Sequence, residues 1–242
     1  MIVSDQLWVI LTFFSASILQ GVSGFGIALI AIPLLVNIFG LKTAAPLMAG
    51  LGLFIQLVMT IRYRQSFNFS AVWRLTLASF CGIPLGIYLL SRVPEVFLLT
   101  ILGVVTVLYA LYRLFQLPIP GLVNKNWSLV FGGAAGLLAG AYSASGPPIV
   151  IYADSQRWTP DAFRSNVSGF FLLNTIVVNI THYLNGNITE IVWRTWLITV
   201  PFIFCGLLIG FYVNQFVNLV RFRQIVMVLL LVLGLRLILS QV

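Results

Sequence analysis

Apolar residues dominate this chain in long runs that short polar stretches separate. Eight apolar segments fall at about residues 7–39, 43–61, 71–90, 97–115, 127–153, 163–184, 193–213 and 223–240. About 20 consecutive apolar residues are enough for a helix to cross a bilayer. The pattern therefore predicts an all-α, polytopic membrane protein in which almost the whole chain lies in the membrane.

Two of these segments are interrupted by small and helix-breaking residues. Residues 20–26 read QGVSGFG, and residues 142–148 read YSASGPP. Because lipid offers no partner to a freed N–H or C=O group, a broken helix at membrane depth is tolerated only inside protein or beside a water-filled cavity. Two such breaks in corresponding places of two halves are typical of the binding site of a transporter.

The two halves of the chain also resemble each other. The sequence FCGIPLGIY at 80–88 matches FCGLLIGFY at 204–212, with Cys, Gly and Tyr in register, and the two breaks have a similar spacing. Such a match favours an internal duplication over chance similarity between apolar helices. We predict one membrane domain made of a first repeat at 1–115, a linker at 116–126 and a second repeat at 127–242.

The positions of the 13 Lys and Arg residues bear on the topology. If all eight segments cross the membrane, seven lie on one side and six on the other, which gives no orientation. If each broken segment is a hairpin that enters and returns, the split is four against nine. Because Lys and Arg are enriched in cytoplasmic loops, this split favours hairpins, with both termini outside and the linker in the cytoplasm. Each half then crosses three times, so the repeats are inverted; the alternative with eight crossings stays open.

The composition of the chain limits the functions and ligands that we expect. Charged residues make up 7% of the chain, and its net charge of +8 is scattered over short loops and forms no basic stripe, so we expect no nucleic-acid partner. No nucleotide-binding motif, metal-ligand cluster or acidic residue deep in a span is visible, and we predict no cofactor, no metal and no catalytic residue. Cys81 and Cys205 are expected to be buried packing residues. The predicted partners are a small anionic substrate, membrane lipid and, as a possibility, a second copy of the chain.

The breaks are the candidate binding site. Half-helix N-termini carry partial positive charge and suit an anion, and serine hydroxyls add donors. The alternative is that the small residues only allow close helix packing. The predicted substrate-binding residues at the breaks are Gln20, Ser23, Gly24 and Gly26 in the first half, and Ser143, Ser145 and Gly146 in the second.

Two cations and one amide complete the predicted site. Lys42 and Arg164 each follow a broken segment at similar places in the two halves, and either could hold an anion or serve only as an orientation signal. Asn174 is deep in its helix. The remaining polar residues within spans are expected to join helices, and His182 is interpreted as an interfacial histidine; the set is Gln56, Asn166, Asn179 and His182.

Two other functions remain open. Residues 21–24 have the Gly-x-Ser-Gly form of rhomboid intramembrane proteases, with Ser23 as the nucleophile and His182 as the lone later histidine. The second break has no histidine of its own, and duplication of the break fits a transport site better. A passive anion channel is the other alternative.

The sequences around the breaks resemble a known family. Residues 24–26 leading to IAIPLL at 30–35, GPPIVIY at 146–152 and FRS at 163–165 are similar to the motifs of the sulfite exporter TauE/SafE family, also called the TSUP transporters. The resemblance implies a multi-pass secondary transporter, not an enzyme, that moves sulfite, an organosulfonate or a similar small anion across a bacterial inner membrane.

Overall fold

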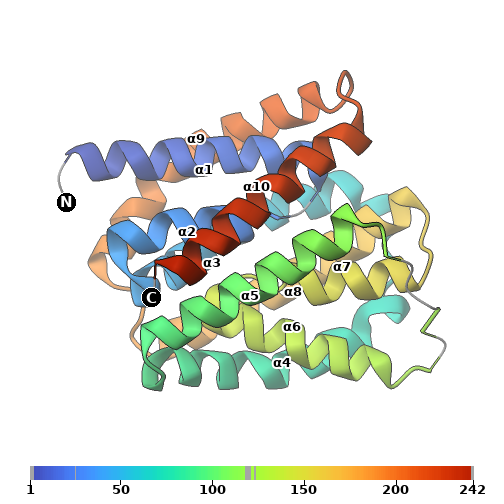
Figure 1. The fold of residues 1–242 in the computed structure, drawn as a ribbon, viewed down its shortest axis with the longest axis horizontal. Coiled ribbons are helices and arrows are strands. Elements are labelled where there is room, and N and C mark those ends of the chain that lie inside the picture. Colours follow the sequence, from blue (N-terminus) through green and yellow to red (C-terminus); the bar gives the residue numbers. More distant parts are fainter. Residues whose placement is uncertain (1–2, 25, 118–120, 123, 241–242) are drawn as a thin grey trace.

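The computed structural model of the chain describes residues 3–24, 26–117, 121–122 and 124–240, and in these residues it is helical throughout (Figure 1). Phe25 in the first break and Pro118 and Pro120 in the linker lie outside the described residues. The α-helices are α1 (Val3–Ser23), α2 (Ile27–Phe39), α3 (Leu41–Tyr63), α4 (Phe69–Arg92), α5 (Glu95–Leu114), α6 (Trp127–Tyr142), α7 (Gly146–Ser155), α8 (Pro160–Leu184), α9 (Glu190–Val213) and α10 (Leu219–Leu239), with the short 3₁₀-helix η1 (Arg64–Ser66) between α3 and α4.

Seven of the described helices are long and apolar enough to cross a membrane: α1, α3, α4, α5, α8, α9 and α10. Their outer faces carry many exposed large apolar side chains, among them Trp8, Leu108 and Tyr212. A water-soluble bundle would turn such residues inward, whereas lipid accepts them. The predicted all-α polytopic membrane fold is confirmed.

The prediction for the two cysteines was wrong. Cys81 in α4 and Cys205 in α9 are both exposed. In a soluble helix the apolar stripe marks the core, but a membrane helix is apolar on its lipid face as well. Hydrophobicity alone therefore did not distinguish a packed position from a lipid-facing one.

Helix directions follow from contacts between named residues. The hydroxyl of Ser165, early in α8, donates a hydrogen bond to the carbonyl of Tyr63 at the end of α3. Near the other end of α8, Asn179 Nδ2 donates to the carbonyl of Ala49, early in α3, at 2.9 Å. Helices α3 and α8 are therefore antiparallel.

The second broken segment is a helical hairpin. Ser79 in α4 donates to Asn174 Oδ1 in α8 at 2.7 Å, and the N–H of Asn68, before α4, donates to Asn166 Oδ1, so α4 and α8 run in the same direction. Helix α6 also runs parallel to α4, because Gly136 lies against Ser79 and Gly140, one turn later, against Ile83. Since α6 and α8 point the same way, the intervening α7 runs back.

The first broken segment has the same form. Helix α1 runs parallel to α9, because Gly206 lies against Ser17 and Gly210 against Ile18. A short connection joins α9 to α8 and reverses the chain, so α9 and α1 both run parallel to α3. Helix α2 therefore returns between α1 and α3, as the ribbon shows (Figure 1). Both breaks are hairpin turns, the arrangement that the charge split favoured.

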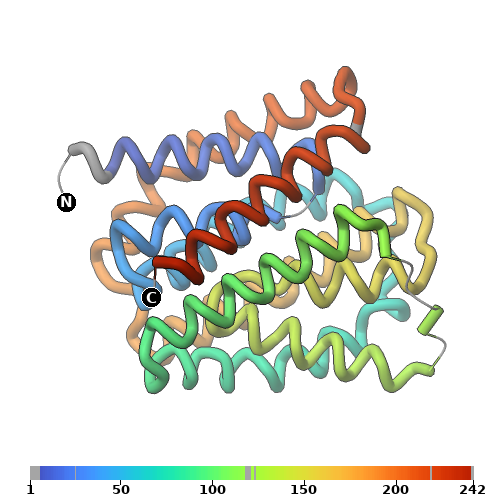
Figure 2. The backbone as a smooth tube through the Cα atoms, viewed as in Figure 1, coloured from blue at the N-terminus to red at the C-terminus, as the bar shows by residue number. Residues whose placement is uncertain are grey.

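The hairpins place the loops at two ends of the bundle. The N- and C-terminal ends of the chain lie at the same end, together with the turns that precede α3, α5 and α9 (Figure 2). The end of α5 and the start of α6 lie at the opposite end, together with the turns that precede α4, α8 and α10. We call the latter the linker end.

Glycine allows the closest helix contacts. A Cβ added at Gly82 in α4 would lie 2.5 Å from the carbonyl oxygen of Gly133 in α6, and one added at Gly210 in α9 would lie 2.4 Å from the carbonyl oxygen of Ile18 in α1. Small residues let backbones approach in this way and so strengthen packing in lipid, where no hydrophobic driving force acts between helices. Gly82 thus serves helix packing.

Candidate functional site

At the first break, one side chain links the end of α1 to the start of α2. Helix α1 ends at Ser23, and Gly24 and Gly26 have φ of 87° and 101°, a left-handed conformation that glycine adopts without strain. Gln20, in the last turn of α1, donates from Nε2 to the carbonyl of Gly24 at 3.3 Å and accepts at Oε1 from the N–H of Ile27 at 3.2 Å. The amide of Gln20 thereby joins the end of α1 to the start of α2.

The second break is anchored to the neighbouring α3. Ser143 ends α6 with φ of 53°, and its hydroxyl donates to the carbonyl of Ala45 at 2.7 Å. Helix α7 begins at Gly146 and carries Pro147 and Pro148 in its first turn. Proline suits this position because the first N–H groups of a helix have no partner within it.

Both hairpin turns meet at one buried space, which we call the central cavity. Its volume is about 50 Å³. The end of α1 and the start of α2 line it on one side, the second break and the start of α7 on another, and the middle parts of α3 and α8 complete it. Because its residues in α3 and α8 lie near the centres of two spans, the cavity lies at mid-membrane depth.

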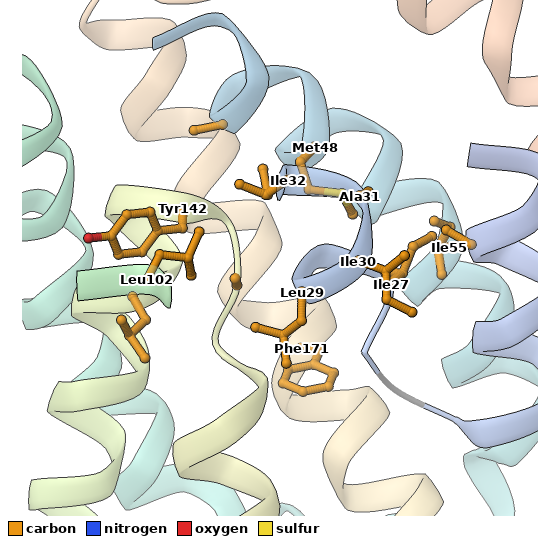
Figure 3. Close-up of a cluster of buried hydrophobic side chains, with 14 of the residues drawn as sticks. Ile27, Leu29, Ile30, Ala31, Ile32, Met48, Ile55, Leu102, Tyr142 and Phe171 are labelled. Carbon is orange, nitrogen blue, oxygen red and sulfur yellow. The ribbon is translucent and has the colours of Figure 1, made fainter. Parts of the chain in front are cut away.

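The apolar part of the central cavity comes mainly from α2 and α8. Leu29 in α2 points toward Phe171 in α8, and both side chains line the cavity (Figure 3). Ile27 and Ile30 continue this packing toward Ile55 in α3. These contacts pack the first turn of α2 against α3 and α8, with its N-terminus at the cavity.

The polar part consists of backbone groups and uncharged side chains. None of the described residues that line the cavity is ionisable. The first turns of α2 and α7 both lie at the cavity, so two positive ends of helix dipoles converge there. A Cβ added at Gly26 or Gly146 would meet no atom within 4 Å, which shows that both glycines border open space.

Two buried amide side chains at the cavity each have one atom without a hydrogen-bond partner among the described residues. Asn174 is 2% exposed; its Oδ1 accepts from Ser79, but its Nδ2 has no partner. Gln56 in α3 is 6% exposed, and its Oε1 has no partner either. Buried polar atoms are usually paired, so an unpaired donor and acceptor at one cavity indicate that a ligand or water completes them.

The structure brings six of the ten predicted site residues to the central cavity: Gln20, Gly26, Ser143, Ser145, Gly146 and Asn174. Sequence reasoning had assigned Gln56 only to helix packing. No sequence signal separated it from Asn166 and Asn179, which do join helices. All three are uncharged amides within spans.

Four predicted site residues lie elsewhere. Ser23 and Gly24 are in the first break but do not line the cavity; Ser23 donates to the carbonyl of Leu19 at 2.7 Å. The side chain of Arg164 lies beside Gly24, and its guanidinium carbon is 5.5 Å from the ring centre of Tyr63. Lys42 is exposed near the start of α3. At 1.5 Å per residue along α3, it is about 30 Å from Tyr63 and hence from Arg164.

The proposed protease pair does not form. Gly24, next to Ser23, lies beside Arg164 near the start of α8, whereas His182 lies 18 residues further along that helix, about 27 Å away. His182 is also fully buried, with Nδ1 3.0 Å from Asn187 Nδ2, so it is packed inside the bundle and is not an exposed interfacial side chain. This geometry does not allow His182 to serve as the base of Ser23.

The fold and site together define a class: a multi-pass membrane protein whose two helical hairpins meet at a midplane cavity lined by apolar and uncharged polar residues, an arrangement found in secondary transporters. Comparison with family models finds a match to the sulfite exporter TauE/SafE family over residues 9–237. The chain therefore belongs to this family, whose members are transporters and not enzymes. Neither curated proteins nor solved structures yield a match to the chain.

Proposed function

We propose that this protein is a secondary transporter of a small anion, such as sulfite or an organosulfonate, and that the anion binds in the central cavity. The observation that carries the proposal is the meeting of two half-helix N-termini, those of α2 and α7, at one cavity at mid-membrane depth. N–H groups and dipole ends of this kind stabilise negative charge.

The donors available favour a small oxyanion. The first turn of α2 offers N–H groups that have no partner within the helix, while Ile27 is already bonded to Gln20. In the first turn of α7, only Gly146 and Ile149 carry an N–H, because Pro147 and Pro148 have none. Asn174 Nδ2 adds a side-chain donor. A volume of about 50 Å³ is comparable to the space of a few waters, which suits an anion of a few atoms.

The neutral lining also fits a transport cycle. A buried cation would hold an oxyanion in a charge-assisted pair that is strong and slow to release. Dipoles and neutral amides attract the anion less strongly, so it can bind from one side and leave on the other. The family's description as a sulfite exporter supports this substrate class.

We further propose that the two halves are inverted repeats, residues 1–115 and 127–242, joined by the linker 116–126. Packing is reciprocal: α4 of the first half lies along α6 of the second, and α9 of the second lies along α1 of the first. The counterparts α3 and α8 are antiparallel. Rocking of one such repeat against the other is the usual route to alternating access.

Orientation and location follow from the basic residues. Nine of the 13 Lys and Arg residues fall at the linker end in the hairpin arrangement, so we assign this end to the cytoplasm and the chain termini to the opposite side. The corresponding membrane is the inner membrane of a bacterium.

The test is counterflow in proteoliposomes that contain the purified full-length protein. Vesicles loaded with unlabelled sulfite are diluted into a trace of ³⁵S-sulfite, and transient accumulation of label above equilibrium is expected because a carrier exchanges one anion for another. Vesicles without protein are the control. A passive channel gives no such overshoot, so sulfite flux without overshoot would contradict the carrier mechanism, and absence of any sulfite flux would contradict the substrate.

A further inference from the structure

A second cavity opens at the linker end, between the end of α5, the end of α7 and the start of α10. We call it the outer cavity; its volume is about 430 Å³. Arg113 from α5, Asp154 from α7 and Arg223 from α10 supply its charged lining, and Tyr112, Gln116 and Gln224 supply most of its neutral polar lining. None of these residues lines the central cavity.

The Asp154 carboxylate in the outer cavity already has a cationic partner. Arg113 forms an ion pair with Asp154, and their side chains are only 20% and 29% exposed. The hydroxyl of Tyr112 lies 3.5 Å from the same carboxylate oxygen. Burial raises the pKa of the Asp154 carboxyl above its ordinary value, and the Arg113 guanidinium partly offsets this effect. The Asp154 carboxylate is thus the intramolecular counterion of Arg113.

Arg223 forms no ion pair of this kind with any described residue. Its Nε atom is buried without a hydrogen-bond partner among the described residues. Besides the attraction of Asp154, it experiences the positive charges of Arg113 and Arg164. The Arg223 guanidinium is therefore exposed to two other positive charges, and among the described residues that line the outer cavity only Asp154 carries a carboxylate. Like charges held together at a partly buried site repel each other unless an anion compensates them, and the planar fork of arginine suits an oxyanion.

We infer that the outer cavity binds a small oxyanion, with Arg223 as its main ligand and Arg113 as the second. The site differs from the central cavity in composition, because it is charged and lies at the end of the bundle. Its role in transport rests on the proposed function: it concentrates the anion at the linker end, before or after passage through the central cavity.

The geometry connects the two cavities. Helix α7 has Asp154 in its last turn and Gly146 in its first, eight residues or about 12 Å apart, so one short helix touches both spaces. Arg164, which acts on Arg223 electrostatically, has its side chain beside Gly24 of the first break. Positive charge therefore extends from the outer cavity toward the hairpin turns.

The experiment is titration calorimetry of the full-length protein in lipid nanodiscs, with sulfite as the probe at low and high salt. Wild type is expected to show two classes of sites, of which the outer one weakens with salt because it is open and charged. Arg223→Gln should weaken the salt-sensitive class about tenfold or more. Arg221→Gln is the matched control, since Arg221 is in the same turn of α10, is exposed and does not line the cavity.

The variant Asp154→Asn distinguishes loss of the binding site from loss of the fold. This change removes the competing carboxylate and frees Arg113, so it should tighten the salt-sensitive class by about fivefold, which an unfolded variant cannot do. Unchanged salt-sensitive binding in Arg223→Gln, or weaker binding in Asp154→Asn with an intact thermal transition, would overturn the outer site.

A central-site variant separates the two proposals. Gly146→Leu, which fills the central cavity, should keep the salt-sensitive class and lose the other. If Gly146→Leu instead leaves both classes intact while Arg223→Gln removes one, the outer site stands and the central site fails. If Arg223→Gln changes nothing and Gly146→Leu removes all binding, the outer site fails and the central site stands.

Discussion

Gln20 holds Ile27 across the first helix break: its Oε1 accepts the N–H of Ile27 at 3.2 Å. Its Nε2 donates to Gly24 in the same turn. The side chain that borders the central cavity is therefore also the one that closes the break. Gln56 borders the same cavity from α3, but its buried Oε1 has no partner among the described residues. The two glutamines allow structure and binding to be separated.

Gln20→Leu should destabilise the protein. The change removes both hydrogen bonds and leaves the buried N–H of Ile27 without this partner, which lowers the free energy of unfolding by about 1–3 kcal/mol. Gln56→Leu removes the unpaired Oε1 and should leave stability within about 0.5 kcal/mol of wild type, or raise it. Because Oε1 can only accept a hydrogen bond, the change should weaken binding of hydrogen sulfite, whose O–H can donate to it, and not of the fully deprotonated anion. Thermal unfolding in detergent together with calorimetry measures both effects. Equal destabilisation by the two variants would show that Gln56 also has a structural partner.

The glycine contacts between the halves predict large effects of a single methyl group. A Cβ at Gly140 in α6 would lie 2.2 Å from the carbonyl oxygen of Ile83, and one at Gly210 in α9 would lie 2.4 Å from that of Ile18. Gly140→Ala and Gly210→Ala should each cost about 1–3 kcal/mol or more, because the neighbouring backbone must move. Thermal unfolding of the purified variants is the measurement.

Gly133→Ala is the matched control for these contacts. Gly133 is also in α6, but a Cβ there meets no atom within 4 Å. The change should be neutral or stabilising by up to about 1 kcal/mol, because alanine favours the helix. Similar destabilisation by all three variants would mean that loss of glycine itself, and not the close contact, is responsible.

Topology can be tested with single cysteines on a background without Cys81 and Cys205. Both native cysteines are exposed, so each needs replacement by a residue that lipid accepts, such as alanine. Asn185→Cys and Ser240→Cys at the end that carries the termini should react with a membrane-impermeant maleimide in intact cells. Gln116→Cys and Gln215→Cys at the linker end should react only after permeabilisation. Labelling of residues 116 and 215 from opposite sides would contradict the hairpin arrangement, because eight crossings place these two residues on opposite sides and hairpins place them on the same side.

Arg164 should affect capture of the anion more than its binding in the central cavity. Its side chain lies at the first break beside Gly24 and does not line the cavity. Arg164→Gln should raise the KM for sulfite about threefold to tenfold at low salt, with little change in maximal rate, and high salt should reduce the difference. Arg164→Lys, which keeps the charge, should restore most of the loss.

Arg64→Gln is the control for this prediction, because Arg64 is an exposed cation at the same end of the bundle. It should leave the KM nearly unchanged. If Arg164→Gln instead abolishes sulfite binding at every salt concentration, the anion contacts Arg164 directly, and the site extends to the first break.

The sequence was sufficient to predict the helical membrane fold and the two breaks, and it favoured the hairpins while leaving eight crossings open. The reason is that Gly, Pro and Ser within apolar runs disturb a helix locally, and the spread of Lys and Arg reports topology. Cys81, Gln56 and Lys42 are residues whose surroundings such reasoning did not predict. The lipid-facing side of a helix, the amide that faces a cavity and the cation that stays at the surface all depend on how helices rotate against their neighbours. Hydropathy does not record that rotation.

The most direct test of the central site is sulfite transport by Gly146→Leu compared with Gly133→Leu. Both variants add the same side chain to a glycine whose added Cβ would meet no atom within 4 Å, and neither glycine has a positive φ. Only Gly146 lines the central cavity. In counterflow with matched amounts of folded protein, Gly146→Leu should reduce sulfite exchange at least about tenfold, while Gly133→Leu should retain exchange close to wild type. Wild-type exchange by a well-folded Gly146→Leu would contradict a site between the two hairpins.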